Sequence, residues 1–156
     1  MKTLFITLFL ALIAYLVWPF TTLYQLDQAL QQSDRARLAE LVDLQTVRAE
    51  IKRKMNKEME SSIGEVSGSF VEWLQSGIQR LGSGAIDQMV DLEWAMHQLR
   101  SHNPDPRQGG LLNQLDYAFF DGPNSLLLRI GELGENPVHA RLTRDGERWR
   151  ITAIYN

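Results

Sequence analysis

The sequence predicts an α+β fold in which an N-terminal transmembrane helix precedes several amphipathic helices packed on a four-stranded antiparallel meander. Three observations predict it. An uncharged apolar segment opens the chain, apolar residues recur at helical spacing over residues 25–100, and the spacing changes to alternation after residue 110. Because a helix repeats every 3.6 residues and a strand every two, this change of period marks the passage from helices to strands.

The first element is an apolar leader. No residue between Lys2 and Asp27 carries a charge. The run from residue 4 to 20 spans about 25 Å as a helix, close to the ~30 Å hydrocarbon core of a bilayer. We therefore expect residues 1–24 to form a membrane anchor that contacts the lipid bilayer through residues 4–20. Three aromatic residues are expected at the membrane interface: Trp18, Phe20 and Tyr24.

A cleaved signal peptide is the alternative interpretation of this leader, because such a peptide also has a positive start and an apolar core. Its cleavage site needs small residues, whereas bulky Trp18 and Phe20 follow the apolar core here, so we favour an uncleaved anchor. Lys2 should stay in the cytoplasm by the positive-inside rule. This predicts a single-pass protein of the inner membrane of a Gram-negative bacterium, with the domain on the periplasmic side. Arg35 and Arg37, soon after the anchor, argue mildly for the opposite orientation.

Residues 25–156 are predicted to form a single domain, of which residues 25–100 are helical. Four stretches carry apolar side chains at helix-compatible spacing, and they start near Leu26, Val47, Ile63 and Ala85. Ser33-Asp34 is a plausible capping pair between the first helix and the next one. A second break is expected at residues 82–84, where two glycines flank a serine.

Residues 101–110 are expected to link the helices to the sheet, because two prolines and two glycines end the helical pattern. Residues 111–156 then contain four sets of alternating apolar residues, which predict four half-buried strands. The sets are Leu115, Tyr117 and Phe119; Leu126, Leu128 and Ile130; Val138, Ala140 and Leu142; and Trp149, Ile151, Ala153 and Tyr155. Asp121-Gly122 and Asp145-Gly146 are expected in hairpin turns between strands.

Three segments together resemble a bacterial family known as domain of unknown function 2939. They are ALQQSDRARLAELVDLQTVRAEIK, FVEWLQSGIQRLGSGAIDQMV and LTRDGERWRITAIY. The resemblance implies a short anchored protein with an apolar leader, then helices, then a terminal sheet ending in an R-x-G-x-x-W-x-[LI] hairpin. Ser33 replaces a glycine often seen before the aspartate, and Gln45 stands where a proline is common. The family has no assigned activity, so the resemblance implies no functional residue.

Composition and motifs exclude several function classes. The chain has no cysteine, which excludes disulfides, thiolate metal sites and cysteine nucleophiles. The formal net charge of -3 gives no reason to expect nucleic-acid binding. Glu93 and His97 lie one helical turn apart, but two ligands on one helix are a weak metal signal. Because the sequence has neither a nucleophile elbow nor a phosphate-binding loop, we expect a non-catalytic protein without a cofactor.

The predicted strands carry basic residues at the positions opposite the apolar sets: Arg129, His139, Arg141 and Arg150. If consecutive strands pair, these side chains share the outer sheet face, which is the face turned away from the helices. Such a face is suited to docking anionic lipid headgroups or an acidic partner. The alternative is a solvated surface with acidic neighbours such as Glu132 and Glu147.

These expectations combine into two hypotheses. The first is an accessory or interaction subunit of a membrane or envelope protein assembly, with a protein partner. The second is a domain that binds a small molecule or a lipid in a pocket between the helices and the sheet. A roomy apolar cavity with a few convergent polar groups would favour the second.

Overall fold

The fold places several helices against one face of an antiparallel sheet, as predicted, in a computed structural model that describes residues 2–60, 69–102 and 110–155. The helices are α1 (Lys2–Gln32), α2 (Arg35–Leu41), α3 (Leu44–Glu60), α4 (Ser69–Leu81), the 3₁₀ turn η1 (Gly82–Gly84), α5 (Ala85–Met89), α6 (Leu92–Leu99) and α7 (Leu111–Gln114). The strands are β1 (Leu115–Gly122), β2 (Ser125–Ile130), β3 (Val138–Asp145) and β4 (Arg148–Tyr155).

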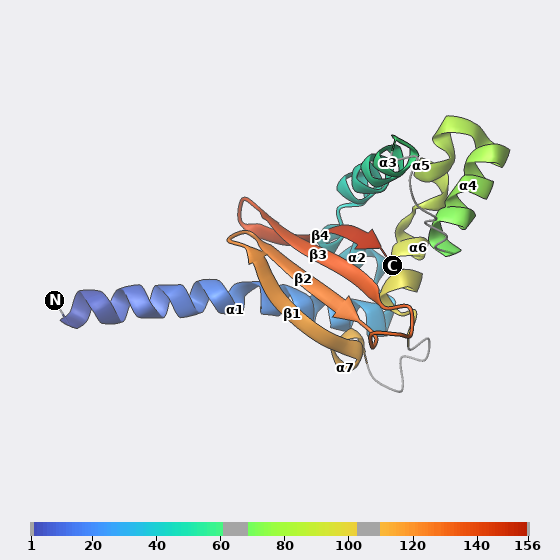
Figure 1. The fold of residues 1–156 in the computed structure, drawn as a ribbon. Coiled ribbons are helices and arrows are strands. Elements are labelled where there is room, and N and C mark those ends of the chain that lie inside the picture. The colour runs from blue at the N-terminus through green and yellow to red at the C-terminus, as the bar shows by residue number, and fades with distance from the viewer. Residues whose placement is uncertain (1, 61–68, 103–109, 156) are drawn as a thin grey trace.

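Helix α1 is continuous and belongs to two parts of the molecule. Its first half projects away from the sheet, and its second half runs behind the strands (Figure 1). The side chains of residues 2–14 are all exposed, whereas Leu23, Leu26 and Leu30 are buried in the core. The expected boundary at residue 24 therefore does not coincide with a helix end.

The predicted break at Ser33-Asp34 is confirmed, and its geometry is a Schellman motif. The Asp34 N–H donates to the Ala29 carbonyl at 2.9 Å, and the Ser33 N–H donates to the Leu30 carbonyl at 3.2 Å. Ser33 has a φ of 55°, a left-handed conformation that favours glycine. Asp34 then caps α2 by accepting a hydrogen bond from the Arg37 N–H at 3.0 Å.

The remaining helical predictions are partly confirmed. The break at residues 82–84 is present, with Gly82 at a φ of 74°. The stretch that starts near Ala85 is helical but divided into two helices, because Asp91 caps a new helix by accepting from the Trp94 N–H at 2.8 Å. The start of the third predicted stretch, at Ile63, and most of the linker, residues 103–109, lie outside the described residues.

The strands pair in the order β1-β2-β3-β4, all antiparallel, which confirms the predicted meander. Asp145-Gly146 lies at the β3–β4 turn, where Gly146 has a φ of 61°. The β1–β2 turn lies two residues later in the chain than predicted. Asp121-Gly122 ends β1, and Pro123-Asn124 forms the tip, because Gly122 already pairs with Ser125.

A register shift in β1 and another in β4 reverse the face to which the following side chains point. The predicted assignment of those side chains to the inner or outer sheet face was therefore wrong. In β1 the shift lies between Leu115 and Tyr117, so Tyr117 and Phe119 lie on the outer sheet face. Ala118 and Phe120 pack against the core instead. In β4 the shift lies between Ile151 and Ala153. Ile154 then occupies the core, and Tyr155 pairs with His139 on the outer face. An extra residue in one strand has this effect because side chains alternate between the two faces.

Candidate functional site

The four basic residues predicted on the strands do share the outer sheet face. Arg129 pairs directly with His139 across β2 and β3. Arg141 lies two residues along β3, and Thr143 beyond it pairs with Arg150 of β4. Directly opposed residues of an antiparallel pair point to the same side, so the meander brings all four to one surface.

Each arginine of this surface has an aspartate partner. Arg129 forms an ion pair with Asp116. Arg141 lies 3.0 Å from Asp121. Arg150 lies 3.3 Å from Asp43 and 3.1 Å from Asp145. The acidic neighbours are thus aspartates of the strands, the turn and the start of α3, and not Glu132 and Glu147. The face is polar and locally neutralised, because each cation has a nearby carboxylate.

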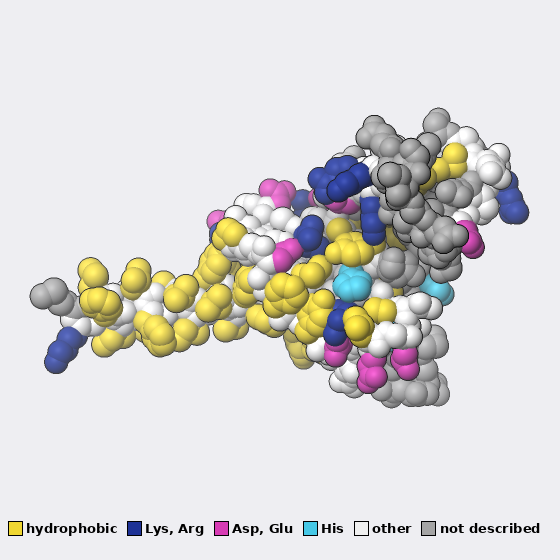
Figure 2. All heavy atoms as spheres, viewed as in Figure 1, with side chains coloured by type: hydrophobic (Ala, Val, Ile, Leu, Met, Phe, Trp, Pro, Cys, Tyr) yellow, Lys and Arg dark blue, Asp and Glu magenta, His cyan; other side chains and the backbone are white. Residues whose placement is uncertain are grey.

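Aromatic side chains also lie on the outer sheet face, at its two edge strands β1 and β4 and on β3. The rings of His139 and Tyr155 stack with centroids 5.5 Å apart and an interplanar angle of 12°. The rings of Tyr117 and Phe119 lie 5.2 Å apart. Phe119 is 47% exposed. Figure 2 shows hydrophobic side chains and a histidine gathered over the strands on the face turned to the viewer.

Two cations lie against these aromatic rings. The Arg129 guanidinium lies 4.2 Å from the Tyr117 ring centroid, and the Lys54 ammonium lies 4.6 Å from the Tyr155 ring centroid. Lys54 comes from α3, so this helix reaches over the edge of the sheet beside β4. Sequence reasoning missed the aromatic residues of this face because both register shifts lie beside them. The strongest available signal was the density of aromatic residues in β1.

The protonation equilibrium of His139, which lies on this face, is shifted by its surroundings. Burial lowers the pKa of His139 below its ordinary value of 6.5, and the positive charges of Arg129 and Lys54 lower it further. The imidazole is therefore held toward its neutral form. A neutral ring stacked on Tyr155 adds apolar surface to the face without adding charge.

The three predicted interface aromatics differ in their surroundings. Phe20 and Tyr24 are exposed on α1, at 43% and 56%. Trp18 is partly buried and packs against the core, which its predicted place in a lipid interface did not anticipate. The Arg144 guanidinium lies 4.6 Å from a Trp18 ring centroid and 5.6 Å from the Tyr15 ring centroid.

The β1–β2 turn contacts α1 at Tyr15, the first residue of this helix that is not classed as exposed. The Tyr15 hydroxyl donates to the Pro123 carbonyl and lies 3.0 Å from Asn124 Oδ1. Arg144, at the β3–β4 turn, contacts the same helix turn. We call Pro123, Asn124, Arg144, Gly146 and Glu147 the α1-side turns, because they lie at the end of the sheet from which the first half of α1 projects (Figure 1).

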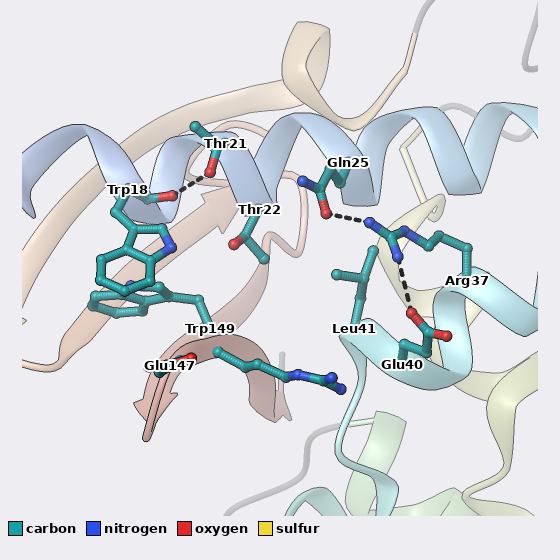
Figure 3. A pocket seen from close by; sticks show the side chains of 10 residues that line it. Trp18, Thr21, Thr22, Gln25, Arg37, Glu40, Leu41, Glu147 and Trp149 are labelled. Carbon is teal, nitrogen blue, oxygen red and sulfur yellow. Dashed lines mark hydrogen bonds and ion pairs between the residues drawn. The ribbon is translucent and has the colours of Figure 1, made fainter. Parts of the chain in front are cut away.

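A cleft of about 260 Å³ lies between α1, α2 and the start of β4. Figure 3 shows Trp18, Gln25, Arg37 and Trp149 around it. Two of its charged groups are paired with each other, since Arg37 donates to Glu40 at 2.9 Å, and Arg37 also donates to Gln25 at 2.7 Å. This polar lining differs from the roomy apolar cavity that the small-molecule hypothesis requires.

Of the two residues considered for metal binding, Glu93 has another partner. Glu93 forms an ion pair with Arg35, across from α6 to α2. The His102 ring nitrogens lie 3.0 Å from Ser101 Oγ and 3.0 Å from the Glu135 carbonyl. Within the described part of the chain, no group of three or more histidine, aspartate or glutamate side chains is placed to hold a metal ion.

Comparison with protein families matches residues 8–97 to the family described as "Protein of unknown function (DUF2939)". The matched residues include most of the apolar half of α1 and extend to α6. Two of the three segments that resemble this family lie inside the match, and the terminal hairpin segment lies outside it. Neither the comparison with curated proteins nor that with solved structures gave a match.

Proposed function

This chain belongs to the DUF2939 family of proteins of unknown function, and from that premise we propose that it is a non-catalytic, membrane-anchored interaction domain. In this proposal it serves as an accessory subunit of a membrane or envelope protein assembly. The observation that carries the proposal is the half-exposed aromatic outer sheet face, with Phe119 at 47% exposure beside Tyr117. Aromatic residues and arginine are enriched where proteins contact one another.

The packing of α1 supports an uncleaved anchor. The helix is long and apolar enough to cross a membrane, a property that a signal sequence shares. Cleavage near residue 25 would remove Thr22 and Leu23 from the folded core, where Leu23 is 1% exposed. Burying one leucine side chain contributes about 1.5–3 kcal/mol. Retention of this helix therefore favours the folded domain as well as its attachment to the membrane.

The charge pattern of the outer sheet face favours a protein partner over anionic lipid. A lipid-binding surface needs unpaired cations, whereas Arg129, Arg141 and Arg150 each have a carboxylate neighbour. A protein partner that covers the exposed ring of Phe119 instead removes apolar surface from water. With Lys2 in the cytoplasm, this face lies in the periplasm, and the partner lies there or in the inner membrane.

Co-purification from gently solubilised native membranes tests this proposal, with Phe119→Asp as the informative variant. Placing a carboxylate at this exposed aromatic position should reduce recovery of the partner, because an unpaired charge would be buried at the contact. Leu133→Asp is the matched control, since Leu133 is 76% exposed on the β2–β3 connection. We expect this control to retain the partner.

Two results would count against the proposal. If the wild-type protein is recovered only as a monomer, it has no partner under these conditions and the proposed interaction is contradicted. Equal recovery with Phe119→Asp and Leu133→Asp would place the contact on another surface. Thermal unfolding of both variants checks that each remains folded.

A further inference from the structure

The sheet has two edge strands, and they differ in what lies beside them. Beside β4, Val42 forms a parallel bridge with Ile151, and the Asp43 N–H donates to the Ile151 carbonyl at 2.9 Å. β1 pairs with β2 on one side, and no other described segment pairs with its outer side. Figure 1 shows β1 at the lower border of the sheet. The N–H and C=O groups along this outer side therefore remain available to another strand.

The open edge of β1 carries no unpaired charge. Edge strands are commonly protected from further pairing by lysine, by proline or by charges that point inward. The stretch from Tyr117 to Phe120, between the two register shifts of β1, pairs regularly with β2 and contains neither a charge nor a proline. The flanking aspartates, Asp116 and Asp121, are ion-paired with arginines of β2 and β3. Nothing in this stretch therefore repels an incoming strand.

Helix α1 exposes an apolar flank beside the same edge. Residues three and four apart lie on one side of a helix. Leu16, Phe20 and Tyr24 form such a row, and each is more than 40% exposed. The row continues to Asp27, which accepts a hydrogen bond at 3.2 Å from the Leu112 N–H in α7, directly before β1. Because the opposite flank of α1 lines the cleft beside β4, this row faces the side of β1.

We infer that an extended segment of a partner protein pairs with the open edge of β1 as a fifth strand. Successive side chains of a strand point to opposite faces. Those on the inner face of the added strand cover Leu16, Phe20 and Tyr24, and those on the outer face pack beside Phe119. The inference rests on the proposed protein partner and specifies how that partner binds.

The chemistry of the site defines the partner segment. Main-chain hydrogen bonds to β1 hold an extended peptide, and pockets for its alternate side chains give specificity. The inner side chains are apolar, because they contact leucine, phenylalanine and tyrosine side chains of α1. Proline is absent at the positions that donate to β1, since it has no N–H.

A second copy of this chain is the other possible occupant of the edge, and the direction of α1 argues against it. Two antiparallel β1 strands in one continuous sheet are related by a two-fold axis normal to the sheet. Figure 1 shows α1 running behind the sheet and along it. This axis would therefore point the two α1 helices in opposite directions. Two copies anchored in one bilayer cannot pair in this way, so the added strand belongs to a different protein.

Site-specific photocrosslinking in native membranes tests the inference in the full chain. The photoreactive residue benzoylphenylalanine is introduced at position 20, 119 or 133, one position in each variant, and the crosslinked peptides are identified by mass spectrometry. The native side chains at all three positions are exposed. Positions 20 and 119 lie on the two faces of the added strand, whereas position 133 lies on the β2–β3 connection. Thermal unfolding checks that each variant remains folded.

We expect positions 20 and 119 to crosslink to neighbouring residues of one segment of one other protein, and position 133 to give no adduct with it. If position 119 crosslinks to another protein while position 20 reaches only lipid or a separate segment, strand addition is wrong and the proposed partner stands. Adducts with a second copy of this chain, or equal crosslinking at position 133, also overturn the inference. If neither position 20 nor position 119 crosslinks to a protein, the proposed function fails together with the inference.

Discussion

At the scale of single residues, the surroundings of His139 on the outer sheet face change its protonation equilibrium. Burial, then Arg129 and Lys54, lower the pKa of His139 below 6.5. The folded protein therefore binds this proton less readily than the unfolded chain does. The contribution of neutral His139 to stability is fully present above the unfolded pKa, and it is lost as the pH falls through the lower pKa of the folded state.

This linkage predicts a pH-dependent stability that His139→Phe removes. We expect the free energy of unfolding of the wild type to decline as the pH falls below about 6.5. A phenylalanine keeps an aromatic ring beside Tyr155 but carries no titrating group, so its stability should change less over the same interval. Denaturant unfolding in detergent at a series of pH values measures both. An unchanged pH slope in His139→Phe would contradict the assignment.

At the scale of elements, α1 joins the exposed apolar segment, which we propose to cross the membrane, to the core without an interruption. Pro19 lies inside this helix without ending it, and its ring is buried. The apolar side chains of the first half contact no core, whereas Leu23, Leu26 and Leu30 are nearly fully buried. Two leucines of one helix should therefore respond differently to the same truncation.

Truncating Leu23 should destabilise the domain far more than truncating Leu12. Leu23→Ala removes a side chain that is 1% exposed and leaves a cavity, so we expect a loss of about 2–5 kcal/mol in the free energy of unfolding. Leu12 is 54% exposed, and Leu12→Ala should change that quantity by less than about 0.5 kcal/mol. Denaturant unfolding in detergent measures both. Similar values for the two variants would show that α1 is not part of the core.

The sequence predicted the existence of most elements but not the faces of the outer strands. Helical periodicity and the Ser33-Asp34 pair located the first helices, because local capping and burial act together there. Alternation located all four strands, but the prediction assumed that side chains alternate without interruption along each strand. A bulge leaves no simple trace in composition, so Tyr117 and Phe119 were assigned to the wrong face. The aspartate partners of the arginines were missed because cross-strand register decides them.

At the scale of the whole molecule, the proposed membrane anchor and the sheet are joined through one helix. The contacts of Tyr15 and Trp18 hold the strand turns beside the exposed apolar surface of α1, which continues to Phe20. The proposed interaction face lies on the same rigid sheet. A membrane-retained α1 therefore both concentrates the domain at the bilayer and fixes the direction in which it presents Phe119.

The mass of the mature protein, extracted from native membranes after an alkaline wash, tests this account most directly. We predict a membrane-retained chain that includes residues 15–24, because they complete the core and carry the end of the anchor. A soluble mature chain that begins near residue 25 would contradict it.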